Sequence, residues 1–477
     1  MRSFLFFCFV NITFLGLHNQ YAYSQDSTLV FNIDLQGSLA TNKTPFWLQS
    51  NQFGTIPASG SFISGQWGLH KVYNHGNPRF FQWSAGAQMI TNQSKSGSVF
   101  FTDLFLAAKA GPVELSVGQR RDFMGLADST LSTGSLAMSG NSRPYPKIQL
   151  STPDFVNFIP GNDLISFKLS YADGLLGSAR IGYGNVSKVP DVYMHQKSLY
   201  LRLGGLHHKM SLHAGFNHQA MWGGEDIIFS GGLPAWEAYK YVIFGKPWAA
   251  SRVGNHFGTI DLGAEWRGKN WDIFLYRQSI YEDGSLAQLS NIVDGLNGLR
   301  FKRTNIDKND RSLTLNTVLL EFIYTKEQGG KTFDFDSGTF GNDNYFNHYV
   351  YSQGWSYRGR SLGTPLAVPQ NISRNDIPYT SSLFTANNRI MAFHLGLNAS
   401  FNRTIFLLKG TYSQNFGTYN YPFSSTRNQL SLLIHAERAV PVWKASLLSL
   451  SLAADAGKLY PNSSAITLGW RKIGFIR

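Results

Sequence analysis

Three arginines and a group of aromatic, amide and carboxylate side chains occur in stretches of the sequence that are rich in glycine and proline. The guanidinium groups of Arg143, Arg358 and Arg360 are planar forks that match a carboxylate in bidentate geometry. Tryptophan and tyrosine rings offer flat apolar faces on which sugar rings can stack. These residue types point to the binding of an acidic carbohydrate, with Trp236 as a further stacking ring. The candidate ligand-binding residues are Asn141, Arg143, Tyr145, Trp222, Asp343, Asn344, Tyr345, Trp355, Tyr357, Arg358 and Arg360.

Each of these residues also has a purely structural interpretation. Tryptophan and tyrosine at the base of a loop often form the girdle of a membrane protein at the lipid–water interface. Glycine and proline in such loops more often shape turns than contact a ligand. The run Arg120-Arg121-Asp122 stands at the end of an expected strand and is typical of charges that brace a protein wall.

Catalytic and metal-binding patterns are weak. His207 and His208 are adjacent and point to opposite faces of a strand, and His213 and His218 also fall on opposite parities, so these imidazoles do not converge on one ion. Glu225 and Asp226 are neighbours and cannot flank one glycosidic bond. We therefore expect no metal, no cofactor and no enzymatic activity.

The elements that must position the candidate residues are long alternating strands. In Ile390–Tyr412 the residues Met391, Phe393, Leu395 and Leu397 fall on one face and His394, Gly396 and Asn398 on the other, with a tight turn at Asn402-Arg403. These strands run to about a dozen residues, which is about the length that a tilted strand needs to cross a bilayer. The pattern predicts an all-β fold, an antiparallel transmembrane β-barrel that is apolar outside and polar inside.

Counting alternating runs predicts eighteen strands in one continuous barrel. The expected strands are 28–40, 62–73, 80–91, 99–110, 113–121, 163–173, 177–184, 196–205, 208–221, 256–268, 270–280, 297–305, 312–326, 388–401, 404–416, 427–438, 443–456 and 464–476. The long connections 41–61, 122–162, 222–255, 281–296 and 327–387 alternate with short turns such as Gly111-Pro112 and Ala172–Leu176. Long loops on one rim and short turns on the other are the outer-membrane pattern, with the long loops outside the cell.

The first residues predict the compartment. Arg2, the apolar stretch Phe4–Leu17 and the small residues of Ala22-Tyr23-Ser24 make a secretory signal peptide over residues 1–24, cleaved near Ser24. Cys8 is the single cysteine and lies within this segment, so the expected mature barrel, residues 25–477, has no disulfide. We expect the mature protein in the outer membrane of a Gram-negative cell, as a monomer.

The charge balance bears on the partner. The chain has 42 Lys and Arg against 29 Asp and Glu, and removing Arg2 with the signal peptide leaves 41 − 29 = +12. An outer-membrane address argues against nucleic acid as the partner. Acidic polysaccharide and the phosphates of outer-membrane lipid are the expected partners.

Several stretches resemble a known family, the Wzi-type capsule assembly proteins of Gram-negative outer membranes, and in particular their Bacteroidetes branch. The resemblance spans nearly the whole mature chain and is carried by GSLAMSGNSRPYP at 134–146, LLEFIYTKEQ at 319–328, DNYFN at 343–347 and GWSYRGRSLGTPL at 354–366. It implies an eighteen-stranded barrel that acts as a lectin and holds capsular polysaccharide at the cell surface, without catalytic residues. Strand one begins almost at the cleavage site, which departs from the periplasmic helical segment expected of enterobacterial members.

Two classes of function follow from the sequence. One is a polysaccharide-binding barrel whose lumen is closed by its own loops. The other is a substrate-selective porin for anionic sugars or oligosaccharides, because eighteen strands can enclose an aqueous channel. The loop 327–387 is long enough to fold inward as a plug, which favours the first.

Overall fold

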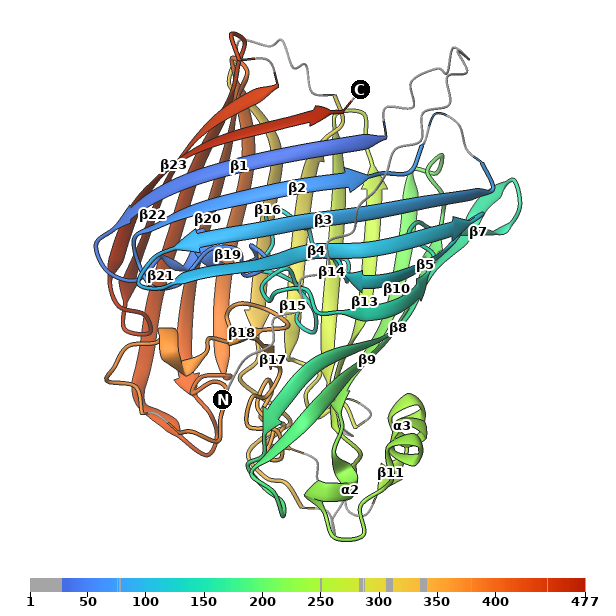
Figure 1. Cartoon of the computed structure of the whole chain (residues 1–477), viewed down its shortest axis with the longest axis vertical. Coiled ribbons are helices and arrows are strands. Elements are labelled where there is room, and N and C mark those ends of the chain that lie inside the picture. The colour runs from blue at the N-terminus through green and yellow to red at the C-terminus, as the bar shows by residue number, and fades with distance from the viewer. Residues whose placement is uncertain are drawn as a thin grey trace, which may run out of the picture.

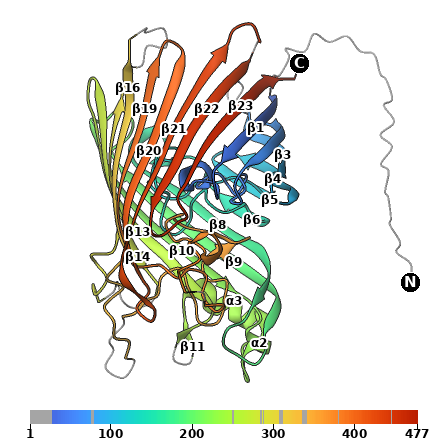
Figure 2. The ribbon, with the colours of Figure 1, turned by 90° about the vertical axis from the view of Figure 1, so that its left-hand side faces the viewer.

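The computed structural model describes residues 28–476 except 75, 77–78, 249–250, 283–285, 287, 306–311, 335–340, 379 and 444. The expected signal peptide therefore lies outside the described residues. The chain forms one closed antiparallel β-barrel, in which the first strand, β1 (Leu29–Ala40), pairs with β2 (Phe62–Lys71) on one side and with the last strand, β23 (Ser463–Phe475), on the other. Figures 1 and 2 show the long loops gathered at one end of this barrel and the C-terminal end of β23 at the other.

The remaining wall strands follow one another around the barrel. They are β3 (Phe81–Gln93), β4 (Gly97–Ala110), β5 (Val113–Gln119), β6 (Lys147–Ser151), β7 (Val156–Ile159), β8 (Asn162–Arg180), β9 (Lys188–Leu203), β10 (Met210–Trp222), β13 (Asn255–Arg267), β14 (Trp271–Tyr281), β15 (Gly295–Arg303), β16 (Thr314–Tyr324), β19 (Ile390–Phe401), β20 (Thr404–Gly417), β21 (Pro422–Val440) and β22 (Ser446–Gly457).

The wall contains eighteen strand positions, as the sequence predicts, but two assignments differ. The sheet holds 19 strands, and the two short strands β6 and β7 share one position because both pair with β8. The expected strands 163–173 and 177–184 are in fact the single strand β8, so Ala172–Leu176 is not a turn. The strand continues through the expected turn, with register shifts at Leu175/Gly177 and Gly177/Ala179. The position missed by the sequence analysis, β6, lies inside the expected loop 122–162.

The predicted faces of the strands are confirmed. Phe393, Ile260, Leu262, Ile466 and Leu468 are exposed on the outside of the wall, whereas Asp261 and His394 are buried on the inside. Asp261 accepts hydrogen bonds there from Gln278 at 3.0 Å and Tyr200 at 3.1 Å. An outside that is apolar all round a closed barrel is the surface that lipid requires. The protein is an outer-membrane β-barrel.

The connections sort onto two rims. Residues 41–61, 120–146, 223–254, 282–294 and 325–389 join strands on the rim opposite the ends of the chain, whereas the turns at 111–112 and 402–403 lie on the other rim. The long-loop rim is the extracellular one. It carries the short elements α1 (Phe46–Gln49), α2 (Glu225–Ile228), α3 (Ala235–Phe244), β11 (Pro247–Trp248), β12 (Ser251–Arg252), β17 (Ser356–Tyr357), β18 (Arg360–Ser361) and η1 (Gln370–Ile372). Among the described residues, no helix is long and apolar enough to cross a membrane.

The wall strands between β4 and β8 are short. β5 pairs with Leu104–Ala110 of β4, β5 and β6 pair with each other through five residues of each, and β6 pairs with Ser170–Gly174 of β8. Side chains hold the chain that leaves β5: Arg121 bonds to Asp103 of β4 at 2.8 Å, and Arg120 bonds to Glu114 of β5 itself at 2.9 Å. These arginines have the bracing role that the sequence indicated.

Candidate functional site

Three of the extracellular loops turn inward and contact the inner face of the barrel wall. We call the described parts of 41–61, 120–146 and 341–389 the plug. Its core is dry, because Trp47, Leu136 and Trp355 are at most 1 % exposed. Side chains in a protein interior pack to high density with few voids, so this core occupies the lumen at its level.

Hydrogen bonds fasten the plug to the inner face of the wall. Trp47 Nε1 donates to Thr411 Oγ1 of β20 at 3.0 Å, and the Nε2 of His394 on β19 lies 2.7 Å from the backbone oxygen of Leu131. Glu321 of β16 accepts from the hydroxyls of Ser132 at 2.6 Å and Thr133 at 2.7 Å and from the Thr133 backbone N–H. These contacts join plug and wall into one body.

The loops of the plug also bond to each other. Trp355 Nε1 donates to the backbone oxygen of Ala137 at 2.7 Å, and the N–H of Ser139 donates to Leu362 O at 2.8 Å. The two stretches that carry most of the family resemblance, 134–146 and 354–366, therefore lie against one another, although they are more than 200 residues apart in the chain.

Several candidate residues belong to this core. Trp355 and Tyr345 are fully buried and Tyr145 is 5 % exposed, so their ring faces are covered by protein. Asn141 is also buried, and its amide donates to Ser361 O at 3.2 Å. The loop 327–387 was expected to be able to fold inward as a plug, and in the structure the largest aromatic residues of the inward-folded loops pack into a core.

Arg360 is a structural residue. Its guanidinium donates to the backbone oxygens of Ile56 at 2.6 Å and Gln49 at 3.2 Å, and to Gln49 Oε1 at 3.2 Å. Burial, together with nearby Arg143, lowers the pKa of Arg360 to about 10, so it stays charged at neutral pH. The group cross-links two loops of the plug.

Arg143 and Arg358 form a basic cluster with Tyr357 at the surface of the plug. The turn between β17 and β18 places Arg358 at its tip, in a left-handed conformation with φ 50°, and leaves its side chain exposed. Arg143 lies 3.4 Å above the ring of Phe100 on β4, and Arg358 lies 5.6 Å from the ring of Tyr357. Burial and the repulsion from Arg358 lower the pKa of Arg143. We call Arg143, Tyr357 and Arg358 the arginine cluster.

The expected sugar-binding trio Asp343, Asn344 and Tyr345 lies elsewhere, and its polar groups are engaged by protein. The Tyr345 hydroxyl donates to Asp294 at 3.0 Å and accepts from Asn291 at 2.9 Å. Asn291 also donates to Asp343 at 3.3 Å, and Asn388 donates to Asn344 at 2.8 Å. These residues join the plug to the loops that flank β14–β16 and β19.

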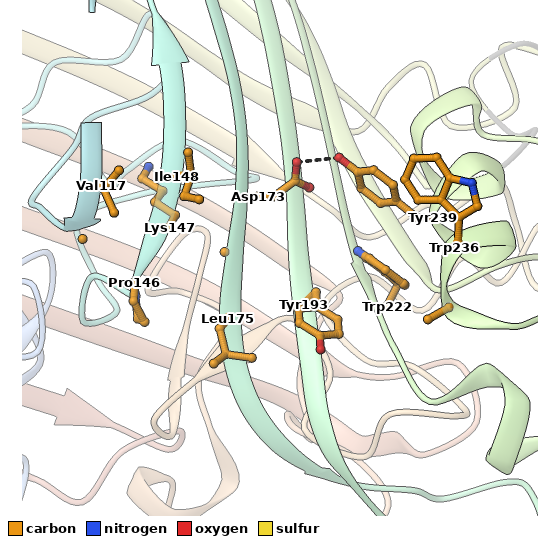
Figure 3. A pocket seen from close by; sticks show the side chains of 13 residues that line it. Val117, Pro146, Lys147, Ile148, Asp173, Leu175, Tyr193, Trp222, Trp236 and Tyr239 are labelled. Atoms are coloured by element: carbon orange, nitrogen blue, oxygen red, sulfur yellow. Dashed lines mark hydrogen bonds between the residues drawn. The ribbon is translucent and has the colours of Figure 1, made fainter. Parts of the chain in front are cut away.

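Trp222 is not at the mouth of the barrel. It lies on the outside of the wall beneath α3, with ring centroids 5.1 Å from Tyr193 and 5.4 Å from Tyr239 (Figure 3). Trp236 is carried by α3 itself and is highly exposed. Of the candidate residues, the structure thus brings Asn141, Arg143, Tyr145, Trp355, Tyr357, Arg358 and Arg360 together, and Tyr345 shares the buried core with Trp355. Trp222, Asp343 and Asn344 lie apart from this group.

The sequence analysis missed the wall residues that hold the plug. Glu321 and His394 are polar residues at positions of β16 and β19 whose side chains alternate inward. This alternation predicts that they face the lumen, but it does not predict which loop residues they contact. Phe100 is an aromatic residue on the inner face of β4, and nothing in the sequence links it to Arg143. Among the described residues, no group of three or more His, Cys, Asp or Glu side chains is arranged to hold a metal ion.

Comparison with known proteins identifies similar folds. No model of a known family matches the chain, and no curated protein matches it. OccAB2 of Acinetobacter baumannii is 10% identical with a TM-score of 0.48, covering 95% of this chain and 100% of its own. The outer membrane protein OprD of Pseudomonas aeruginosa is 10% identical with a TM-score of 0.46, covering 94% of this chain and 95% of its own. These are similarities of fold.

Proposed function

We propose that this outer-membrane barrel binds an acidic polysaccharide at its extracellular mouth and retains it at the cell surface, without a catalytic step. The observation that carries the proposal is the arginine cluster. Among the described residues, neither Arg143 nor Arg358 forms an ion pair with an Asp or Glu side chain. Two like charges held close together attract an anion, and the planar guanidinium suits a uronic carboxylate.

The plug supports retention rather than passage. Its buried core and its bonds to Thr411, Glu321 and His394 hold folded protein against the inner face of the wall, which supports a closed lumen. The resemblance to Wzi-type capsule assembly proteins supports this proposal, because three of the four stretches that carry it, 134–146, 343–347 and 354–366, lie in the plug. Each exposed contact contributes little, about 0–1 kcal/mol, so retention of a polymer depends on many repeats being engaged at once.

The test is binding of the purified barrel to a uronic-acid polysaccharide with and without the cluster. Arg358→Ala should weaken binding several-fold, and added salt should weaken binding by the wild type, because charge attraction is screened over about 10 Å at 0.1 M salt. Arg374→Ala is the matched control, since Arg374 is another loop arginine that already pairs with Asp376 at 3.1 Å. Equal affinity of both variants and indifference to salt would remove the basis of the proposal.

A substrate-selective porin for anionic sugars is the second candidate. It is favoured by the charged inner wall, where Arg471 pairs with Glu437 at 2.5 Å and Arg267 bonds to Glu265, since a channel for hydrophilic solutes needs a polar lining. Single-channel recording in planar bilayers separates the two. Stable open channels that an acidic oligosaccharide blocks would favour the porin, whereas no steady conductance is expected of the retaining barrel.

A further inference from the structure

A groove on the outside of the barrel has no part in the proposed function. It lies between α3 and the outer faces of β5, β6, β8 and β9, and it has a volume of about 630 Å³, within the range of about 300–1,000 Å³ that is typical of small-ligand clefts. Figure 3 shows Val117, Ile148 and Leu175 on one side of it and Trp222, Trp236 and Tyr239 on the other.

Helix α3 is firmly attached to the wall and forms one side of the groove. The Tyr239 hydroxyl donates to Asp173 of β8 at 2.6 Å and lies 2.9 Å from the Tyr171 hydroxyl, and Lys197 of β9 donates to the Ile243 carbonyl at the last turn. Ala238 and Val242 are fully buried in a small cluster with Trp222. Gly245, with φ 58°, ends the helix in the left-handed conformation that favours glycine. The helix is thus a fixed feature of the outer surface.

The floor of the groove continues the lipid-facing surface of the barrel. Val117 and Ile148 alternate with inward-facing residues and share the outward parity of Leu115 and Leu150, and all four are exposed. The groove therefore opens directly onto the hydrocarbon of the bilayer. Its other side is aromatic, as is usual at the level where a barrel meets the lipid headgroups.

We infer that this groove holds one acyl chain of an outer-leaflet lipid more tightly than the open lipid face does. An acyl chain is the occupant that the surroundings supply, because the floor is continuous with the interface between barrel and lipid. Elsewhere a chain meets a single convex face of the wall, whereas here it meets the wall on one side and α3 on the other. Contact on two sides increases the number of close atom pairs and so slows departure.

Native mass spectrometry in detergent micelles doped with palmitoyl-oleoyl phosphatidylglycerol tests the inference. The wild type should keep one lipid after dilution of the free lipid, and Leu175→Trp, which fills the groove, should keep it at least ten-fold less often. Leu199→Trp is the matched control: the residue is 38% exposed against 40% for Leu175 and lies on the open lipid face of β9. Equal retention by all three proteins would overturn the inference. A mass spectrum that shows a dimer of the protein without bound lipid would also overturn the inference.

A second measurement keeps the inference testable if Leu175→Trp inserts poorly. In vesicles of phosphatidylglycerol brominated on the acyl chain, bromine quenches tryptophans that touch the chains. Trp236→Phe should reduce the quenched part of the emission, whereas Trp355→Phe should reduce only the unquenched part, because Trp355 is fully buried in the plug. If Trp236→Phe instead reduced the unquenched part of the emission, Trp236 would not touch the brominated chains, and this result would contradict a lipid-filled groove.

Discussion

At the scale of single residues, three arginines of similar sequence context have three different environments. Arg360 is buried among backbone carbonyls, Arg143 lies over the ring of Phe100, and Arg358 is exposed at the tip of a turn. Burial decides between these roles, because a guanidinium whose donors are already satisfied by protein has little left to offer a ligand.

Arg360→Ala should therefore destabilise the plug rather than alter ligand binding alone. Removal of the side chain leaves the backbone oxygens of Gln49 and Ile56 without their charged donor in a buried site, at a cost on the order of 2–4 kcal/mol. The measurement is the urea midpoint of the folded barrel. Arg358→Ala serves as the control and should leave the midpoint unchanged; an unchanged midpoint in Arg360→Ala would show that the cross-link is dispensable.

Asp294 should give the plug a stability that depends on pH. Burial raises its pKa to about 6 from 3.8, although the N–H groups of Gln328 and Glu327 and the Tyr345 hydroxyl bond to it. Between these two values the native protein binds more protons than the unfolded chain. The free energy of unfolding should therefore fall as pH rises from about 4 to about 6, by up to about 3 kcal/mol, and then level off.

Unfolding of Asp294→Asn measured across the same pH range checks this expectation. The amide cannot ionise, so the slope between pH 4 and pH 6 should disappear, even if the variant is less stable at every pH. A slope that persists unchanged in the variant would assign it to another group.

At the scale of elements, the loop 120–146 is held in the lumen by a small number of wall residues. Glu321 alone accepts from Ser132, Thr133 and Tyr276. A long loop loses conformational entropy when it is held inside a barrel. Loss of such an anchor should therefore release the loop locally while the strands stay paired.

We expect Glu321→Ala to raise the conductance of the barrel in planar bilayers and to expose the loop to protease from outside. Four buried donors would lose their acceptor in this variant: the hydroxyls of Ser132, Thr133 and Tyr276 and the backbone N–H of Thr133. Glu265→Ala is the matched control, because Glu265 pairs with Arg267 on the same wall without contacting the plug. Equal, low conductance in both variants would mean that the plug does not depend on this anchor.

At the scale of the whole molecule, the barrel separates an apolar outside from a polar inside around its entire circumference. Adjacent residues of one strand therefore face the lipid and the lumen in turn. In β1, Leu35 is exposed to lipid, while Gln36 points inward and donates to Asp34 at 2.9 Å.

Leu35→Lys should impair insertion into the membrane, and Gln36→Lys should not. A lysine on the lipid face costs roughly 2–4 kcal/mol near the middle of the bilayer, whereas a lysine in the lumen stays hydrated, here beside Asp34. The folded fraction, read from the heat-dependent shift of the barrel on a denaturing gel, distinguishes the two variants. Similar yields would mean that the register of β1 differs from that described here.

The sequence by itself determined the barrel. A period of two over about a dozen residues is a property of single strands, and burial of one face in lipid requires that period at every strand, so alternation alone predicts the fold, the two faces and the two rims. It failed at β8, where the expected turn Ala172–Leu176 lies inside one continuous strand, and at β6, whose five residues are too few to show a period.

Only the tertiary structure decided what the loops do. The length of 327–387 predicts that this loop can fold inward, but which of its side chains are then buried depends on contacts that the local sequence does not encode. Contacts such as Trp355 with Ala137 and Arg360 with Ile56 join residues more than 200 positions apart, so no local pattern reveals them. For the same reason the sequence around Trp222 does not reveal the position of this residue. Only the structure shows that Trp222 lies on the outside of the wall, where α3 covers it.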